Sequence, residues 1–87
     1  MVFLGTNGLT VEHGLSTPDR DEAATKRAMV ASARRVVVLA DASKIGTECP
    51  LSFASLAEVD VLVTDDGISR PYRRALTQAG IEVVVAA

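Results

Sequence analysis

The chain has 87 residues, of which 48% are hydrophobic and 3% aromatic, and its formal net charge at pH 7 is −2. This length allows one domain at most, with a small core built from Val, Leu, Ile and Ala. Basic residues occur in runs no longer than a pair, which argues against direct binding to DNA. The single cysteine excludes an internal disulfide. Nothing in the sequence resembles a signal peptide or a membrane span, so we expect a soluble cytoplasmic protein without membrane contact.

Short apolar runs predict four β-strands. The first is the end of a strand at residues 2–4, which Gly5 terminates, and the others lie at residues 36–40, 59–63 and 81–86. The last three are β-branched, too short for helices and apolar at consecutive positions, which predicts strands covered on both faces. Asp60 interrupts its run and marks the start of that strand.

Two helices are predicted between these strands. The first spans residues 17–29, where Asp19 and Glu22 have the spacing of a capping box and acidic residues fill the first turn. The second runs from about residue 70 to residue 79. It has Ser69 as N-cap, a proline in its first turn and a glycine just past its end.

Residues 41–58 hold no clear element. Apolar side chains at Leu51, Phe53 and Leu56 indicate a packed loop, and Ser55 can cap a single helical turn.

The element order is β-α-β, a loop, and β-α-β, which predicts right-handed parallel connections and an open, mainly parallel, doubly wound α/β sheet. Two helices are too few to cover both faces of such a sheet. We therefore expect that the chain either oligomerises or is part of a longer chain. The second alternative is favoured because Phe3 already lies in a strand.

Ligands of open α/β sheets bind beyond the carboxyl ends of the strands. Polar segments follow three of the predicted strands, at residues 5–8 (Gly-Thr-Asn-Gly), 41–44 (Asp-Ala-Ser-Lys) and 64–67 (Thr-Asp-Asp-Gly). Gly5 and Gly8 would let backbone N–H groups approach an anion, and Asn7 offers neutral hydrogen bonds. Lys44 offers a mobile positive charge. The sequence thus predicts a site for a phosphorylated sugar at this edge, close to Asp41 and Lys44.

Plainer interpretations of these segments stay open. Residues 5–8 fit an ordinary turn, Asp41 can cap the turn that follows it, and Lys44 can be a solvated loop lysine. Asp65 and Asp66 could be paired carboxylates for acid–base chemistry or a metal, but before a glycine and a helix they are better explained as turn and cap residues.

The remaining polar candidates are His13, Glu22 and Lys26. His13 is the only histidine and has no second His or Cys near it, so we interpret it as a loop residue and expect no metal and no cofactor. Glu22 and Lys26 are one helical turn apart and could simply form an ion pair. Alternatively, the helix begins at the ligand edge, where Lys26 and free N–H groups could reach an anion.

A succession of motifs, in order and over essentially the whole chain, resembles the latter half of the effector-sensing domain of DeoR-type bacterial transcriptional regulators. These motifs are residues 3–9, 14–19, 22–23, 26–29, 38–44, 61–66 and 79–83.

The resemblance implies a fold like those of ribose-5-phosphate isomerase, glucosamine-6-phosphate deaminase and the CoA transferases. It implies an effector that is a phosphorylated sugar or a related small anion, bound by residues that include Asn7, Gly8, Glu22, Lys26, Asp41 and Lys44. It further implies a homo-oligomer whose DNA binding resides in an N-terminal winged helix-turn-helix. That domain and the first half of the sensor are expected to lie outside residues 1–87.

The chain also departs from the enzymes of this fold. The deaminases have an Asp-Gly-His sequence where this chain has Asn7-Gly8-Leu9, so the acid and the histidine needed for ring opening and proton transfer are both absent. This favours a binding module over an enzyme. Two alternatives are kept: an isomerase-like or deaminase-like enzyme with Glu22 or Asp41 as base, and a unit that mainly dimerises through the uncovered face of its sheet.

Overall fold

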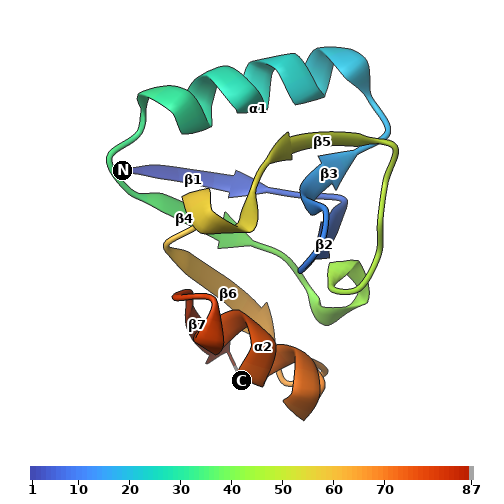
Figure 1. The fold of residues 1–87 in the computed structure, drawn as a ribbon, viewed down its shortest axis with the longest axis vertical. Helices are drawn as coiled ribbons and strands as arrows, with labels where there is room; N and C mark the ends of the chain where they lie inside the picture. Colours follow the sequence, from blue (N-terminus) through green and yellow to red (C-terminus); the bar gives the residue numbers. More distant parts are fainter. Residues whose placement is uncertain (87) are drawn as a thin grey trace.

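The computed structural model describes residues 1–86, and its main feature is a parallel sheet of four strands (Figure 1). The strands pair in the order β1 (Val2–Gly5), β4 (Val36–Leu39), β6 (Val61–Asp65) and β7 (Glu82–Ala86). Helix α1 (Arg20–Ser32) directly precedes β4 in the chain and is part of the crossover from β1 to β4, and α2 (Arg70–Gln78) connects β6 to β7. The predicted α/β class with an open, mainly parallel, Rossmann-like sheet is confirmed.

A second sheet was not expected from the sequence. It is antiparallel, with the order β2 (Gly8–Thr10), β3 (Gly14–Thr17) and β5 (Leu51–Ala54). The prediction of a loop without clear elements over residues 41–58 was therefore wrong in part, since β5 and two short 3-10 turns, η1 (Ala42–Lys44) and η2 (Leu56–Glu58), lie there. Ser55 is the N-cap of η2, as predicted. β2, β3 and β5 have only three or four residues each, which is too short to show a period of alternating hydrophobic and polar residues. The hydrophobic pattern of the sequence therefore did not reveal them.

The N-terminal ends of both helices follow the predicted capping chemistry with one difference, and α1 spans Arg20–Ser32 instead of the predicted residues 17–29. Asp19 accepts hydrogen bonds from the N–H groups of Asp21 (2.9 Å) and Glu22 (3.2 Å), which is one half of a capping box. The other half is replaced, because the Asp19 N–H donates to the Thr17 hydroxyl at 3.3 Å. In α2 the Ser69 hydroxyl accepts from the N–H of Tyr72 at 3.3 Å.

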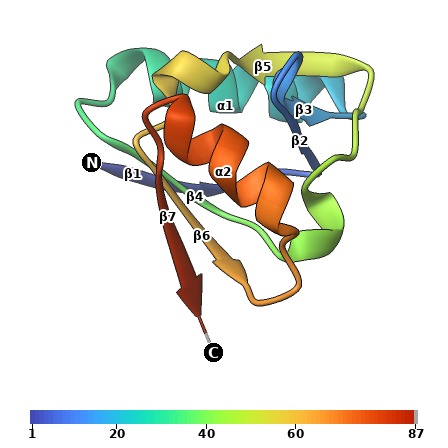
Figure 2. The same cartoon turned by 60° about the horizontal axis from the view of Figure 1, so that its bottom comes forward.

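The core lies on one face of the parallel sheet. All crossovers advance in the same direction along the strand order, and right-handed connections then place both helices on the same side (Figure 2). The inner face carries the row Leu4, Val38, Leu62 and Val83, which packs against the small sheet and the helices. The prediction of a doubly wound sheet is thus wrong for residues 1–86.

The opposite, outer face of the parallel sheet is apolar, with buried Val37 and Val61 in its central strands and exposed side chains around them. Phe3 is 59% exposed, Leu39 48% and Val84 40%, and the register places all three on this face. The expectation that two helices would leave part of the sheet uncovered is confirmed.

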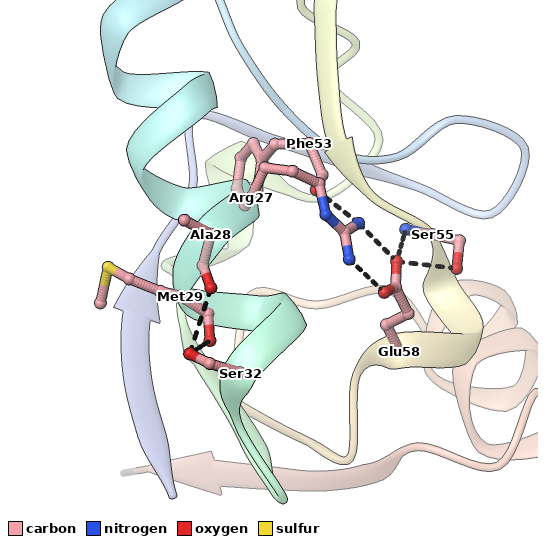
Figure 3. Close-up of polar contacts among 7 residues, drawn as sticks. All are labelled: Arg27, Ala28, Met29, Ser32, Phe53, Ser55 and Glu58. Carbon is pink, nitrogen blue, oxygen red and sulfur yellow. Dashed lines mark hydrogen bonds and ion pairs between the residues drawn. The ribbon is translucent and has the colours of Figure 1, made fainter.

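An ion pair ties α1 to the turn after β5 (Figure 3). Arg27 donates from Nη1 to Oε1 of Glu58 at 2.8 Å and from Nη2 to Oε2 at 2.5 Å. The N–H of Ser55 donates to the same carboxylate at 3.0 Å. The hydrogen bonds from Arg27, and after them the one from Ser55, lower the pKa of Glu58 from 4.5 to about 2.

This ion pair predicts a specific loss of stability in acid. Because the pKa of Glu58 is lower in the folded chain than in the unfolded one, its contribution is present above the unfolded value of 4.5 and is lost as the pH falls toward about 2. The side chains are 43% and 35% exposed, so we expect a contribution of only about 1 kcal/mol.

Urea unfolding at about pH 6 and about pH 3 measures this loss. The variant Glu58→Gln should lose less of its free energy of unfolding between the two pH values than the unaltered chain. Glu48→Gln removes an exposed carboxylate and should keep the full acid sensitivity. Equal losses in all three proteins would refute the role of the ion pair.

Candidate functional site

The segments that follow β1 and β4 meet at the carboxyl edge of the parallel sheet. The two strands are parallel neighbours, with Gly5 paired to Leu39 at their ends. Beyond them, the N–H of Gly46 donates to the carbonyl oxygen of Leu9 at 2.7 Å, and Ile45 forms a bridge with Leu9. These contacts hold the segment after Lys44 beside the segment that starts at Asn7.

Lys26 reaches this edge from α1. Its Nζ donates to the carbonyl oxygen of Gly5 at 2.7 Å, pairs with Oε1 of Glu22 at 2.6 Å, and lies 5.5 Å from the centre of the Phe53 ring. The ion-pair interpretation of Glu22 and Lys26 is therefore confirmed, and Lys26 also lies at the end of β1. Because Glu22 balances its charge, Lys26 contributes little net positive charge to the edge.

Asp41 and Lys44 lie in the turn that follows β4. Asp41 caps η1 by accepting hydrogen bonds from the N–H of Ser43 at 3.1 Å and from the Ser43 hydroxyl. The hydroxyl hydrogen bond, together with the nearby charge of Lys44, lowers the pKa of Asp41 below its usual value. The capping interpretation of Asp41 is confirmed.

Lys44 is half-buried, and no ion pair holds its charge within residues 1–86. The ion pairs found among residues 1–86 join Lys26 to Glu22, Arg27 to Glu58 and Arg35 to Glu82. Of the two lysines, Lys44 is thus the one whose ammonium group is free to meet an anion.

Gly8 is required by close packing. A Cβ atom at Gly8 would lie 2.3 Å from the carbonyl oxygen of Thr47 and 2.8 Å from the hydroxyl oxygen of Ser16. Its φ angle is not positive, so the need for glycine comes from this contact and not from backbone conformation. The preceding residue, Asn7, is exposed to solvent at the same edge.

His13 lies apart from these residues. It is in the turn between β2 and β3, where it lines a cavity of about 530 Å³ together with Arg27 and Glu58. The predicted site residues do not line this cavity.

Within residues 1–86, no group of three or more His, Cys, Asp or Glu side chains is placed to hold a metal ion. Over the same part of the chain, no helix has the length and apolar character that crossing a membrane requires.

Sequence reasoning missed two residues at this edge. Ser43 holds the Asp41 carboxylate, and its position two residues after an aspartate is a spacing that could have revealed it. Phe53 lies under the ammonium group of Lys26. Because this contact joins β5 to α1, which are far apart in the sequence, no local sequence pattern predicts it.

Comparisons with known proteins agree with the motifs in the sequence. The model of the family described as "DeoR C terminal sensor domain" matches residues 1–66. The HTH-type transcriptional regulator GlpR of Haloferax volcanii is 46% identical over 84 residues, which are 97% of this chain and 33% of that protein.

Two further relatives are named as repressors. The putative aga operon transcriptional repressor of Escherichia coli O157:H7 is 33% identical over 98% of this chain and 32% of its own length. The HTH-type transcriptional repressor GlcR of Bacillus subtilis is 33% identical over 95% of this chain and 32% of its own length. The chain thus spans about a third of the length of these relatives.

Proposed function

The chain belongs to the DeoR C-terminal sensor domain family of transcriptional regulators, and from this premise we propose that it senses a phosphorylated sugar or a related small anion. The proposed site is the carboxyl edge of the parallel sheet, with Asn7, Gly8, Glu22, Lys26, Asp41 and Lys44 as its residues.

The observation that carries this proposal is the meeting of distant segments at one edge. Lys26 comes from α1, Asn7 follows β1, and the Asp41–Lys44 turn follows β4. Lys44 supplies a charge without an ion-pair partner among residues 1–86. A phosphate group binds well to such a charge. The exposed Asn7 and Asp41 offer hydrogen-bonding groups for the hydroxyls of a sugar.

Binding without conversion is the favoured chemistry. Asn7-Gly8-Leu9 lacks the acid and the histidine of the deaminase motif, and His13 is part of a different cavity. The relatives described above are named as transcriptional regulators. Turnover of ribose 5-phosphate or glucosamine 6-phosphate that vanishes in Glu22→Gln would favour the enzymatic alternative instead.

The proposal extends to DNA through parts of the protein outside residues 1–87. A winged helix-turn-helix would contact the operator, and effector binding would change operator affinity through the differential stability of two states of the oligomer. The acidic net charge of −2 on this chain agrees with DNA contacts that reside elsewhere.

Thermal unfolding with a panel of sugar phosphates tests this function on the protein as its gene encodes it. At least one phosphorylated sugar should raise the melting temperature in a saturable manner, while the same sugar without its phosphate should not. Operator binding should then change with the same compound. No shift with any member of the panel, together with unchanged operator binding, would overturn the proposal.

A second role, assembly, is favoured by the open outer face of the sheet. This face presents Phe3, Leu39 and Val84 to solvent, and large apolar patches of this kind mark association surfaces. Here the proposed occupant is a second copy of the chain, in a homo-oligomer.

We expect sedimentation coefficients that rise with concentration for the unaltered chain and do so much less for Leu39→Lys. Val11→Lys changes an apolar residue that is 40% exposed in the turn between β2 and β3, so it serves as control. A constant coefficient for the unaltered chain would exclude this role.

A further inference from the structure

The carboxylate of Asp65 joins two turns at the carboxyl edge of the sheet. Asp65 is the last residue of β6, next to β4 in the sheet. Its Oδ2 accepts a hydrogen bond from the N–H of Ala42 at 3.1 Å, and its Oδ1 accepts one from the N–H of Gly67 at 2.8 Å. One side chain therefore fixes the turn after β4 and the turn after β6 at the same time.

The bond to Ala42 lies where the pairing of the strands ends. The last ladder contact on this side is the hydrogen bond from the N–H of Ala40 to the carbonyl oxygen of Val63 at 3.1 Å. Ala42 is the first residue of η1, and Lys44 is its last. The N–H of an initial helical residue has no partner within its own helix, and here Asp65 provides one. This carboxylate thus helps to fix the orientation of η1 relative to the sheet.

Close packing reinforces the contact between the two turns. A Cβ atom at Gly67 would lie 2.9 Å from Oδ1 of Asp65 and 3.1 Å from the Cβ of Ala42. The two turns therefore leave no space for a side chain at position 67.

We propose that Asp65 is a positioning residue of the anion site, which holds the Asp41–Lys44 turn against the sheet so that Lys44 faces the anion. The inference rests on the proposed function, because Lys44 matters here only if an anion binds at this edge. It also gives different roles to Asp65 and Asp66, which the sequence alone did not distinguish. Asp65 braces the site, whereas Asp66 is exposed.

Amide hydrogen exchange tests the brace without any ligand. In Asp65→Ala the N–H groups of Ala42 and Gly67 lose their acceptors, so they should exchange about five- to tenfold faster, and Lys44 should follow. The N–H of the buried Val38 in β4 reports on the stability of the whole chain and should change much less. Asp66→Ala is the matched control and should leave all of these rates unchanged. Unchanged exchange at Ala42 and Gly67 in Asp65→Ala would overturn the proposal.

Binding of ribose 5-phosphate and of inorganic phosphate, measured by calorimetry well below the melting temperature, tests the link to the site. Asp65→Asn keeps the shape of the side chain but turns an NH₂ group toward one of the two N–H donors. We expect it to weaken binding about three- to tenfold and Asp66→Asn to leave binding within about twofold.

A double-mutant cycle with Lys44→Gln separates positioning from general stability. If Asp65 acts through Lys44, the Asp65→Asn change should cost less than about twofold once Lys44 is gone. The same fold-loss in both backgrounds would show that Asp65 does not act through Lys44. Should the unaltered protein bind neither compound, the proposed function fails for them, while the exchange experiment still decides whether the brace exists.

Discussion

Replacing Lys44 by Gln is expected to weaken the binding of a sugar phosphate by about ten- to a hundredfold, which corresponds to the loss of one charge-assisted hydrogen bond. The size of the effect follows from the charges at the carboxyl edge. Lys26 is already engaged by Glu22 and by the carbonyl oxygen of Gly5, so it cannot take over the role of Lys44. Lys44 is half-buried in a turn that Asp41 and Asp65 fix. Since the only other lysine of the chain is Lys26, no second lysine replaces the lost charge.

The matched control for this variant is Arg34→Gln. Arg34 is exposed and lies just before β4, at the opposite edge of the sheet from Lys44. The Arg34→Gln substitution therefore removes the same charge from the chain, but far from the proposed site. Titration calorimetry at two salt concentrations should show a large loss for Lys44→Gln and a small one for Arg34→Gln. Similar losses for both variants would mean that only the net charge of the chain matters, and the assigned site would then be wrong.

The parts of the fold that could be predicted are those with local signals. The strands at Val36–Leu39 and Val61–Asp65 are apolar over several consecutive residues, and α2 has Ser69 at its start and a glycine after its end. These signals depend only on neighbouring residues. The third strand was predicted at residues 59–63 but begins at Val61, so Asp60 lies directly before it. The Asp60 carboxylate accepts a hydrogen bond from the N–H of Val36 at 2.7 Å.

The antiparallel sheet could not be predicted because its pairing is not local. Leu15 of β3 pairs with Ala54 of β5, far along the chain, and the register shifts between Leu15 and Ser16. Fully buried short strands such as β3 lack the alternation that distinguishes one face from the other. The Arg27–Glu58 ion pair was missed for the same reason, since its partners come from α1 and η2.

The candidate site was predicted in position more than in detail. Topology alone places the ends of β1 and β4 at one edge, so Asn7 and Lys44 could be expected together. The hydrogen bond from Lys26 to Gly5 required the actual packing angle of α1. The brace by Asp65 required the distance between two turns, which no spacing in the sequence reveals.

The one-sided core makes the largest prediction about stability. Leu62 is fully buried in the inner row of the parallel sheet, with Val38 and Val83 at its sides. We expect Leu62→Ala to cost about 2–5 kcal/mol in the free energy of unfolding, from lost burial and from the cavity that remains. A chain of this size has about 4–13 kcal/mol in total, so the variant should be close to unfolding at moderate temperature.

Leu39→Ala is the matched comparison, because it makes the same chemical change on the outer face, where Leu39 is 48% exposed. For an isolated chain we expect it to cost less than about 1 kcal/mol. Urea unfolding of both variants at several protein concentrations measures the difference. If the outer face is covered in solution, the cost of Leu39→Ala should approach that of Leu62→Ala and should depend on concentration where the cover is a second copy. A large cost at Leu39 that is independent of concentration would exclude assembly as its cause and indicate a cover that belongs to the same molecule.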